Sequence, residues 1–264
     1  MAGSSPPSRG IAVAVTVALV SAVAVAGCAS DGRTPAAPAA YVALGDSYSS
    51  GVGAKPISGA CLRSPRSYVG RLGRRVTSFR ACAAASTDAV LRHQLAPFPS
   101  NTRLVTITIG GNDAGFVDVI ATCLLGTSAG CERRVGVAER FIRRDLTGHL
   151  RRVYDAIRER APRATVVVAG YPRLFARRPW CSSIGRVDDR EQRRLNEASD
   201  LLARTIAAEV RRHRGFRFAD VRRAFDGHGV CSSTPRINAA SGIGAFHPTA
   251  SGYATYARVI RARL

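Results

Sequence analysis

Ser47 is the residue of this sequence best placed to act as a nucleophile. It follows Gly45 and Asp46, directly after the short apolar run Tyr41 to Leu44, which is typical of a buried strand. A glycine turn at that point would present the Ser47 hydroxyl at the carboxyl end of a sheet, where open α/β sheets bind ligands. The alternative is that Asp46 and Ser47 only cap a helix, a role that both residue types often fill.

Asn112 lies in a similar position, after the apolar run Leu104 to Ile109 and two glycines. Because successive loops of a parallel sheet share one edge, Asn112 is expected beside Ser47. A side-chain amide there could donate a hydrogen bond to the charge that develops on an acyl oxygen. An ordinary Asn-Asp turn is the competing interpretation.

His247 is the only one of the five histidines predicted to have a rigid place at the edge of the sheet. It directly precedes Pro248, which suits the first turn of a final helix and keeps the preceding residue extended. The other histidines fall in helical stretches or in a glycine-flanked loop: His93, His149, His213 and His228.

Alternating strands and helices are expected to position these side chains. The predicted strands are 41–44, 79–82, 104–109, 165–169 and 216–219, and the predicted helices are 65–75, 88–95, 131–160, 187–212 and 248–263. Two long loops, 170–185 and 226–246, interrupt the alternation. Continuous β-branched runs are typical of parallel strands covered on both faces, so we predict a three-layer α/β/α sandwich with a mostly parallel sheet of about five strands.

The ordered set of three motifs resembles the GDSL or SGNH hydrolase family. The motifs are Gly45-Asp-Ser47, Gly111-Asn-Asp113 and His247-Pro-Thr, and the resemblance spans residues 41–264. It is greatest with secreted actinobacterial lipases and esterases that contain three disulfides, and it implies a flavodoxin-like fold.

The resemblance implies a role for each motif residue. Ser47 would be the nucleophile and His247 its general base, while the oxyanion hole would combine the Ser47 backbone N–H, the Asn112 amide and the Ala84 backbone N–H.

Two positions depart from the family pattern. Ala84 stands where the family usually has glycine, and Gly244 stands where an Asp often completes a triad. We therefore expect a Ser-His dyad, with a backbone carbonyl between Ser241 and Gly244 orienting the imidazole and Asp113 as a less favoured substitute.

The amino-terminal part indicates export. Residues 1–27 have the apolar run of a signal peptide, and Val25-Ala-Gly-Cys28 resembles a bacterial lipobox, so Cys28 is the predicted lipidation site. The sequence then predicts a flexible tether over 28–40 and the hydrolase domain over 41–264. The predicted location is the extracytoplasmic face of the cell membrane, or the medium if Cys28 is not lipidated.

Six cysteines remain beyond Cys28, an even number that indicates disulfides in an exported chain. Their spacing alone leaves the connectivity open, and it does not favour a zinc site. The family resemblance implies the pairs Cys61 with Cys82, Cys123 with Cys131, and Cys181 with Cys231.

The chain carries a formal net charge of +21, and Lys55 is its only lysine. That charge favours contact with anionic lipid or wall polymer, while export and the lack of a known motif argue against nucleic acid. For most arginines, a solvated helix face is the preferred interpretation.

The predicted activity is that of a lipase or esterase without metal or organic cofactor, in a monomer. The alternatives at the same site are a carbohydrate O-deacetylase, a phospholipase or a thioesterase. A non-catalytic lipoprotein that binds anionic surfaces is the alternative from another class. Trp180 is a candidate for the acyl pocket or for packing.

Overall fold

The computed structural model describes residues 1–4, 38–176 and 187–264. Residues Ala37–Leu264 form a compact unit of their own, distinct from Met1–Ala36. The expected signal peptide, Cys28, Trp180 and Cys181 lie outside the described residues. In the described parts, no helix combines the length and the hydropathy needed to cross a membrane.

A five-stranded sheet forms the centre of the compact unit, and all its neighbouring strands are parallel. Its order is β2 (Ser78–Phe79), β1 (Ala40–Gly45), β3 (Thr102–Thr108), β4 (Thr165–Ala169) and β5 (Phe216–Ala219). This is the order of flavodoxin-like sheets, which bind ligands where the order reverses, between β1 and β3. Every residue of β1 is buried, as expected for a strand covered on both faces.

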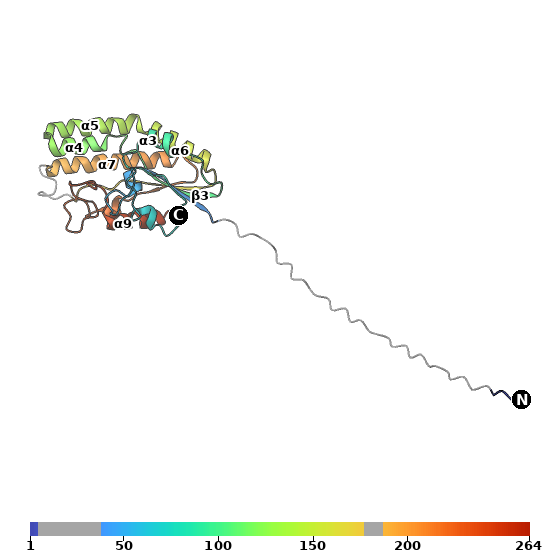
Figure 1. The fold of residues 1–264 in the computed structure, drawn as a ribbon. Coiled ribbons are helices and arrows are strands. Elements are labelled where there is room, and N and C mark those ends of the chain that lie inside the picture. The colour runs from blue at the N-terminus through green and yellow to red at the C-terminus, as the bar shows by residue number, and fades with distance from the viewer. Residues whose placement is uncertain (5–37, 177–186) are drawn as a thin grey trace. The chain divides into compact units, whose positions relative to one another are not determined.

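Helices cover the two faces of the sheet, which confirms the predicted three-layer architecture (Figure 1). One layer holds α3 (Thr87–His93), α4 (Phe116–Leu125), α5 (Ser128–Arg144), α6 (Leu146–Arg160) and α7 (Asp189–Val210). The other holds α9 (Ala250–Arg261), which contacts α2 (Tyr68–Arg71) and α8 (Arg222–Phe225). The one-turn helix α1 (Ser47–Ser50) follows β1.

The long arginine-rich helix α7 illustrates how these layers form. Its apolar side chains at Leu195, Leu202 and Ile206 are buried, while most of its arginines face outward. Asp188 caps the first turn and forms a reciprocal capping box with Glu191. The helix predicted for 187–212 is therefore confirmed, with bounds of Asp189–Val210.

The elements differ from the prediction in several places. The helix predicted for 65–75 is only the four-residue α2, and the strand predicted for 79–82 is the two-residue β2. The single helix predicted for 131–160 is two helices, α5 and α6, which meet at Asp145. That break carries no glycine or proline, so the sequence gives no local signal for it. Helices α4 and α8 were not predicted, because α4 is nearly all apolar and α8 has only four residues.

Two of the implied disulfides are present. Cys61 is bonded to Cys82, and Cys123 is bonded to Cys131. The third implied pair involves Cys181, which lies outside the described residues. The first bond fixes the loop after β2, and the second joins α4 to α5.

Candidate active site

Ser47 is the first residue of α1, just beyond the carboxyl end of the buried strand β1. Gly45 ends that strand with φ of 114°, and a side chain there would collide with the backbone of Thr108 on β3. Asp46 then caps α1, accepting a hydrogen bond of 3.0 Å from the Tyr48 backbone N–H. The capping role considered for Asp46 is thus real, and it leaves the Ser47 side chain pointing out of the turn toward His247.

Asp46 is a buried carboxyl group held by residues from α1, from β3 and from the loop after β4. Its Oδ1 atom accepts from the Thr108 hydroxyl at 2.6 Å, and Oδ2 accepts from the Tyr171 hydroxyl. Tyr171 in turn accepts from the Gly111 backbone N–H at 3.2 Å. Burial raises the pKa of Asp46 to about 6, although each of the hydrogen bonds to Asp46 opposes that shift.

The imidazole of His247 lies against the Ser47 hydroxyl, with His247 Nε2 2.8 Å from Ser47 Oγ. Its other nitrogen, Nδ1, is 2.8 Å from the Ala245 carbonyl oxygen. A carbonyl can only accept, so Nδ1 carries the proton and the neutral ring leaves Nε2 free to accept. Burial lowers the pKa of His247 below its usual 6.5, which keeps the ring neutral at neutral pH.

The orienting group of His247 was predicted incorrectly in detail. A backbone carbonyl does hold the ring, but it belongs to Ala245 rather than to residues 241–244. Asp113, the less favoured substitute, is engaged elsewhere: its carboxylate accepts from the backbone N–H and the hydroxyl of Thr87.

The loop that carries His247 is tied to the rest of the site by two residues. Asn238 donates from Nδ2 to the carbonyls of His247 and Gly53, at 3.0 and 3.2 Å. Tyr48 donates to the Phe246 carbonyl at 2.7 Å, and its ring lies 5.1 Å from the imidazole. Gly53 has φ of 99°, and a side chain there would strike the carbonyl of Pro248 and the Asn238 amide.

Ala84 and Asn112 come from loops that are bonded to each other. Ala84 has φ of 61°, the left-handed conformation that its family counterpart adopts easily as glycine, and it is exposed. Asn112 Nδ2 donates to the Ala85 carbonyl at 2.9 Å, which uses one of its two hydrogens. No hydrogen bond among the described residues uses the Ala84 N–H.

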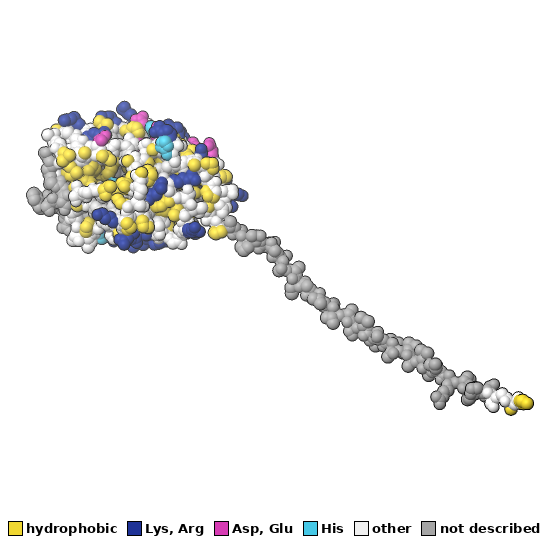
Figure 2. All heavy atoms as spheres, in the orientation of Figure 1, with side chains coloured by type: hydrophobic (Ala, Val, Ile, Leu, Met, Phe, Trp, Pro, Cys, Tyr) yellow, Lys and Arg dark blue, Asp and Glu magenta, His cyan; other side chains and the backbone are white. Residues whose placement is uncertain are grey.

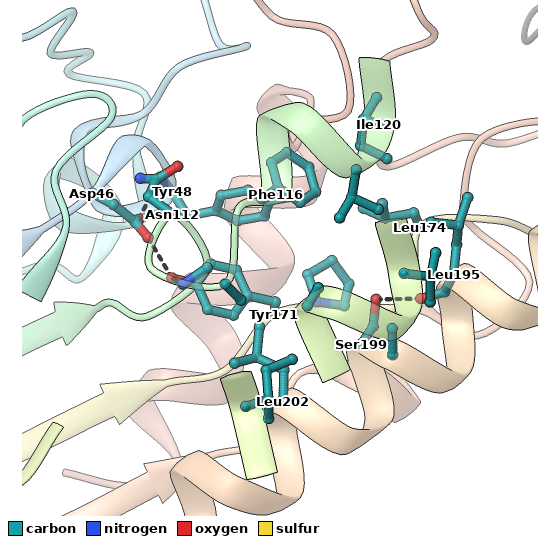
Figure 3. A pocket seen from close by; sticks show the side chains of 18 of the residues that line it. Asp46, Tyr48, Asn112, Phe116, Ile120, Tyr171, Leu174, Leu195, Ser199 and Leu202 are labelled. Carbon is teal, nitrogen blue, oxygen red and sulfur yellow. Dashed lines mark hydrogen bonds between the residues drawn. The ribbon is translucent and has the colours of Figure 1, made fainter. Parts of the chain in front are cut away.

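An apolar pocket begins at Ser47 and extends between α4, α5 and α7. It contains about 700 Å³ of empty space, part of it open to solvent. Figure 3 shows Asp46, Asn112 and Tyr171 at one end and a series of apolar side chains beyond them. The apolar lining residues from the helices and the loop after β4 include Phe116, Val119, Ile120, Val135, Ala138, Ile142, Leu174, Leu195 and Leu202.

The remaining histidines do not belong to this site. His149 contacts Thr87, His213 contacts Asp155, and His228 contacts Thr234. Among the residues that the structure describes, no group of three or more His, Cys, Asp or Glu side chains is arranged to hold a metal ion.

Sequence reasoning missed Tyr171 and Asn238. Tyr171 comes two residues after β4, so the rule that parallel strands share one edge could have identified it. Asn238 lies in a long loop without a recognisable pattern, and only the folded chain shows its role.

Comparisons with known proteins show which family the chain resembles. A family model described as "GDSL-like Lipase/Acylhydrolase family" matches residues 43–255. The chain is 40% identical to Lipase 1 of Streptomyces coelicolor over 90% of this chain and 91% of that protein. It is 41% identical to a lipase of Streptomyces rimosus, over 93% and 94% of the two chains.

Solved structures give the same result. The match with the crystal structure of the extracellular lipase from Streptomyces rimosus covers 85% of this chain and 99% of that chain, with a TM-score of 0.80. The structure of phospholipase A1 from Streptomyces albidoflavus is 40% identical, covers 86% of this chain and 100% of its own, and has a TM-score of 0.81.

Proposed function

The chain belongs to the GDSL-like lipase/acylhydrolase family and is a carboxylic ester hydrolase, and from this premise we propose that Ser47 and His247 form its catalytic dyad. The observation that carries the proposal is the contact of 2.8 Å between Ser47 Oγ and His247 Nε2. The Ala245 carbonyl holds the opposite nitrogen, so the accepting nitrogen faces the hydroxyl.

The reaction follows from this arrangement in two steps. Nε2 of His247 takes the proton of Ser47 while Oγ attacks the acyl carbon, and the imidazolium then protonates the leaving alcohol. In the second step, water attacks the acyl carbon as it loses a proton to the same nitrogen, and the imidazolium then returns this proton to Ser47 Oγ as the acid leaves. The Ala245 carbonyl stabilises the imidazolium and fixes its orientation, the two tasks that a triad carboxylate performs elsewhere.

Three donors are proposed to hold the tetrahedral oxyanion: the backbone N–H groups of Ser47 and Ala84 and the Nδ2 group of Asn112. The support is that the Ala84 N–H has no partner within the described hydrogen bonds and that Asn112 keeps one amide hydrogen. Each such donor is typically worth about 3 kcal/mol of barrier.

We propose that the substrates are esters of long acyl chains. An apolar pocket that starts at Ser47 offers space for a hydrocarbon chain and no charged side chain to pair with a sugar or peptide, apart from the buried Asp46. The apolar lining extends along three helices, farther than an acetyl group could contact, which favours a lipase or phospholipase over an O-deacetylase. The lipase and phospholipase A1 relatives are consistent with this choice.

Export and anchoring complete the proposal. The apolar run and the lipobox of the sequence support cleavage before Cys28, its lipidation, and retention of the enzyme at the outer face of the membrane. A relative described as extracellular supports export. Labelling of the cells with a fatty-acid analogue should mark the wild type and leave the Cys28→Ala variant unlabelled.

The direct test of the dyad is hydrolysis of p-nitrophenyl esters of short and long acyl chains. We expect Ser47→Ala and His247→Ala each to lower kcat by at least about 10³-fold, because the nucleophile and its base act as one unit. Exposed Ser233→Ala serves as the matched control and should keep the wild-type rate. A Ser47→Ala protein as active as the wild type would refute the assignment.

A further inference from the structure

Apart from the chain ends, most of the large exposed hydrophobic side chains of the described residues lie on α4 and α5, two of the helices that line the pocket. Apart from the two chain ends, they are Val117 and Leu125 on α4, Val137 on α5, and Ile243 just before His247. Their exposed fractions are 63%, 83%, 44% and 57%. The other large hydrophobic side chains of the described surface are buried or only partly exposed, so the most exposed ones belong mainly to elements that build the site.

Helix α4 is apolar on both of its faces. Its inward face supplies Phe116, Val119 and Ile120 to the pocket, while Val117, Ala121 and Leu125 recur every fourth residue along the outward face. The outward face of an ordinary surface helix is polar. The single charged residue of α4, Asp118, pairs with Arg134 of α5 at 3.0 Å.

Arginines lie beside this apolar surface. Arg133 and Arg140 are exposed on α5, one turn before and one turn after Val137, and neither has an ion pair among the described residues. Figure 2 shows the wider pattern, in which hydrophobic patches on the surface are interspersed with basic side chains.

We propose that the outer face of α4, together with Val137 and Ile243, docks onto the surface of a lipid aggregate with anionic headgroups. Apolar side chains would enter the interface while the neighbouring arginines meet the headgroups. The same helix that contacts the lipid surface lines the pocket on its other face, so an acyl chain can pass from the aggregate into the pocket. This proposal rests on the proposed function and specifies how the substrate is presented.

A second copy of the chain is a poorer occupant for this surface. A symmetric contact would bring Arg133 and Arg140 of both copies together in a protein whose formal net charge is already +21. Four side chains also make a small patch for a stable protein interface, whereas insertion into a lipid surface requires no shape complementarity.

The binding test uses Ser47→Ala protein and vesicles of ether-linked phosphatidylcholine and phosphatidylglycerol, which no esterase can cleave. Sedimentation should show that Val117→Gln with Leu125→Gln lowers vesicle partitioning by at least about tenfold, because two apolar side chains leave the interface. Ile243→Gln should lower it independently. Leu264→Gln, an exposed leucine away from the patch, is the control and should bind like the parent protein.

A second measurement separates this proposal from the proposed function. With Ser47 intact, the Val117 and Leu125 double variant should hydrolyse a monomeric, water-soluble ester at the wild-type rate and lose activity only on vesicles of ester-linked lipid. Undiminished vesicle partitioning of both the double variant and Ile243→Gln would overturn the docking surface. Failure of the wild type on the soluble ester would instead overturn the proposed function, and the binding result would still stand.

Discussion

At the scale of single residues, the site depends on a neutral imidazole. His247 lies in a setting that disfavours its charged form, and only one backbone carbonyl compensates for the lost hydration. This arrangement keeps the accepting nitrogen available at mildly acidic pH. It also means that the orienting group cannot be removed by changing a side chain, since it belongs to the backbone of Ala245.

The pH dependence of kcat/KM tests this role. Since burial lowers the pKa of His247, activity should rise with pH through a midpoint below 6.5 and stay level near neutrality. Asp46 titrates in the same region, with a pKa of about 6, so the Asp46→Asn variant is the necessary control. A rising limb that persists in this variant assigns the midpoint to His247, and a profile without that limb in the wild type contradicts the role.

Ala84 gives a second prediction at this scale. The left-handed backbone conformation destabilises an alanine by about 1 to 2 kcal/mol. Glycine removes this strain, but the greater flexibility of its unfolded chain costs about 0.4 to 1 kcal/mol. Ala84→Gly should therefore raise the free energy of unfolding by about 0.5 kcal/mol while keeping kcat, because the donor is the backbone N–H.

Urea denaturation measures this effect, and Ala83→Gly is the matched control. Ala83 is not among the residues with positive φ, so glycine there should lower the free energy of unfolding by about 0.4 to 1 kcal/mol. Equal losses at both positions would show that the left-handed conformation of Ala84 carries no strain.

At the scale of elements, the site is a junction of strand ends. Tyr171 follows β4, accepts from Gly111 after β3, and donates to Asp46 after β1. This single hydroxyl therefore connects the loops of three neighbouring strands. The loop with the candidate nucleophile and the loop with Asn112 share it as a common support.

Tyr171→Phe should lower the free energy of unfolding by about 1 to 3 kcal/mol and also lower kcat. The substitution leaves the buried Asp46 without one donor and the Gly111 N–H without its acceptor. The pKa of Asp46 should rise further, since the lost hydrogen bond favours its charged form.

Tyr154→Phe is the matched control for this prediction. Tyr154 is also fully buried, but its hydroxyl has no hydrogen-bond partner among the described residues. Its removal should leave both stability and kcat close to the wild type. Comparable losses in the two variants would mean that the Tyr171 hydroxyl supports nothing beyond packing.

The elements were predictable to different degrees. The β-branched run identified β4 to the residue, because continuous apolar strands are characteristic of a parallel sheet. The short run Phe216 to Ala219 identified β5 equally well, although it contains an arginine and no β-branched residue. Helix α4 escaped prediction because its sequence is apolar on both faces, which the pocket on one side and the exposed stripe on the other now explain. The break at Asp145 depends on packing that no local motif encodes.

At the scale of the whole molecule, cross-links stabilise the loops around the site. The bond between Cys61 and Cys82 joins residues 21 positions apart in the sequence. The bond between Cys123 and Cys131 joins residues 8 positions apart. In the chain-entropy model these closures are worth about 3 and about 2.5 kcal/mol.

Replacing each pair by serine should separate stability from catalysis. Loss of the bond between Cys61 and Cys82 should lower both the free energy of unfolding and kcat, because it releases the loop that holds Ala84. Loss of the bond between Cys123 and Cys131 should lower stability but leave kcat on a short soluble ester unchanged. Equal effects on kcat would show that neither bond positions the oxyanion donors.

The sequence predicted which residues lie in the candidate site, but it did not predict the groups that hold those residues in place. Three short motifs identified the candidate residues that the structure brings together, because the geometry of a parallel sheet brings its loops to one edge. The carbonyl of Ala245, the Asn238 amide and the Tyr171 hydroxyl act through the fold of irregular segments. Such segments carry no periodicity, so sequence reasoning could not assign the orienting group correctly.

The contact between Ser47 and His247 joins positions 200 residues apart, so the proposed dyad exists only where distant parts of the chain have folded together. The hydroxyl follows the strand β1, whereas the imidazole precedes the helix α9. A fragment that ends before His247 keeps the hydroxyl and lacks the proposed proton acceptor. Hydrolysis by the proposed dyad would therefore report that the whole compact unit has folded.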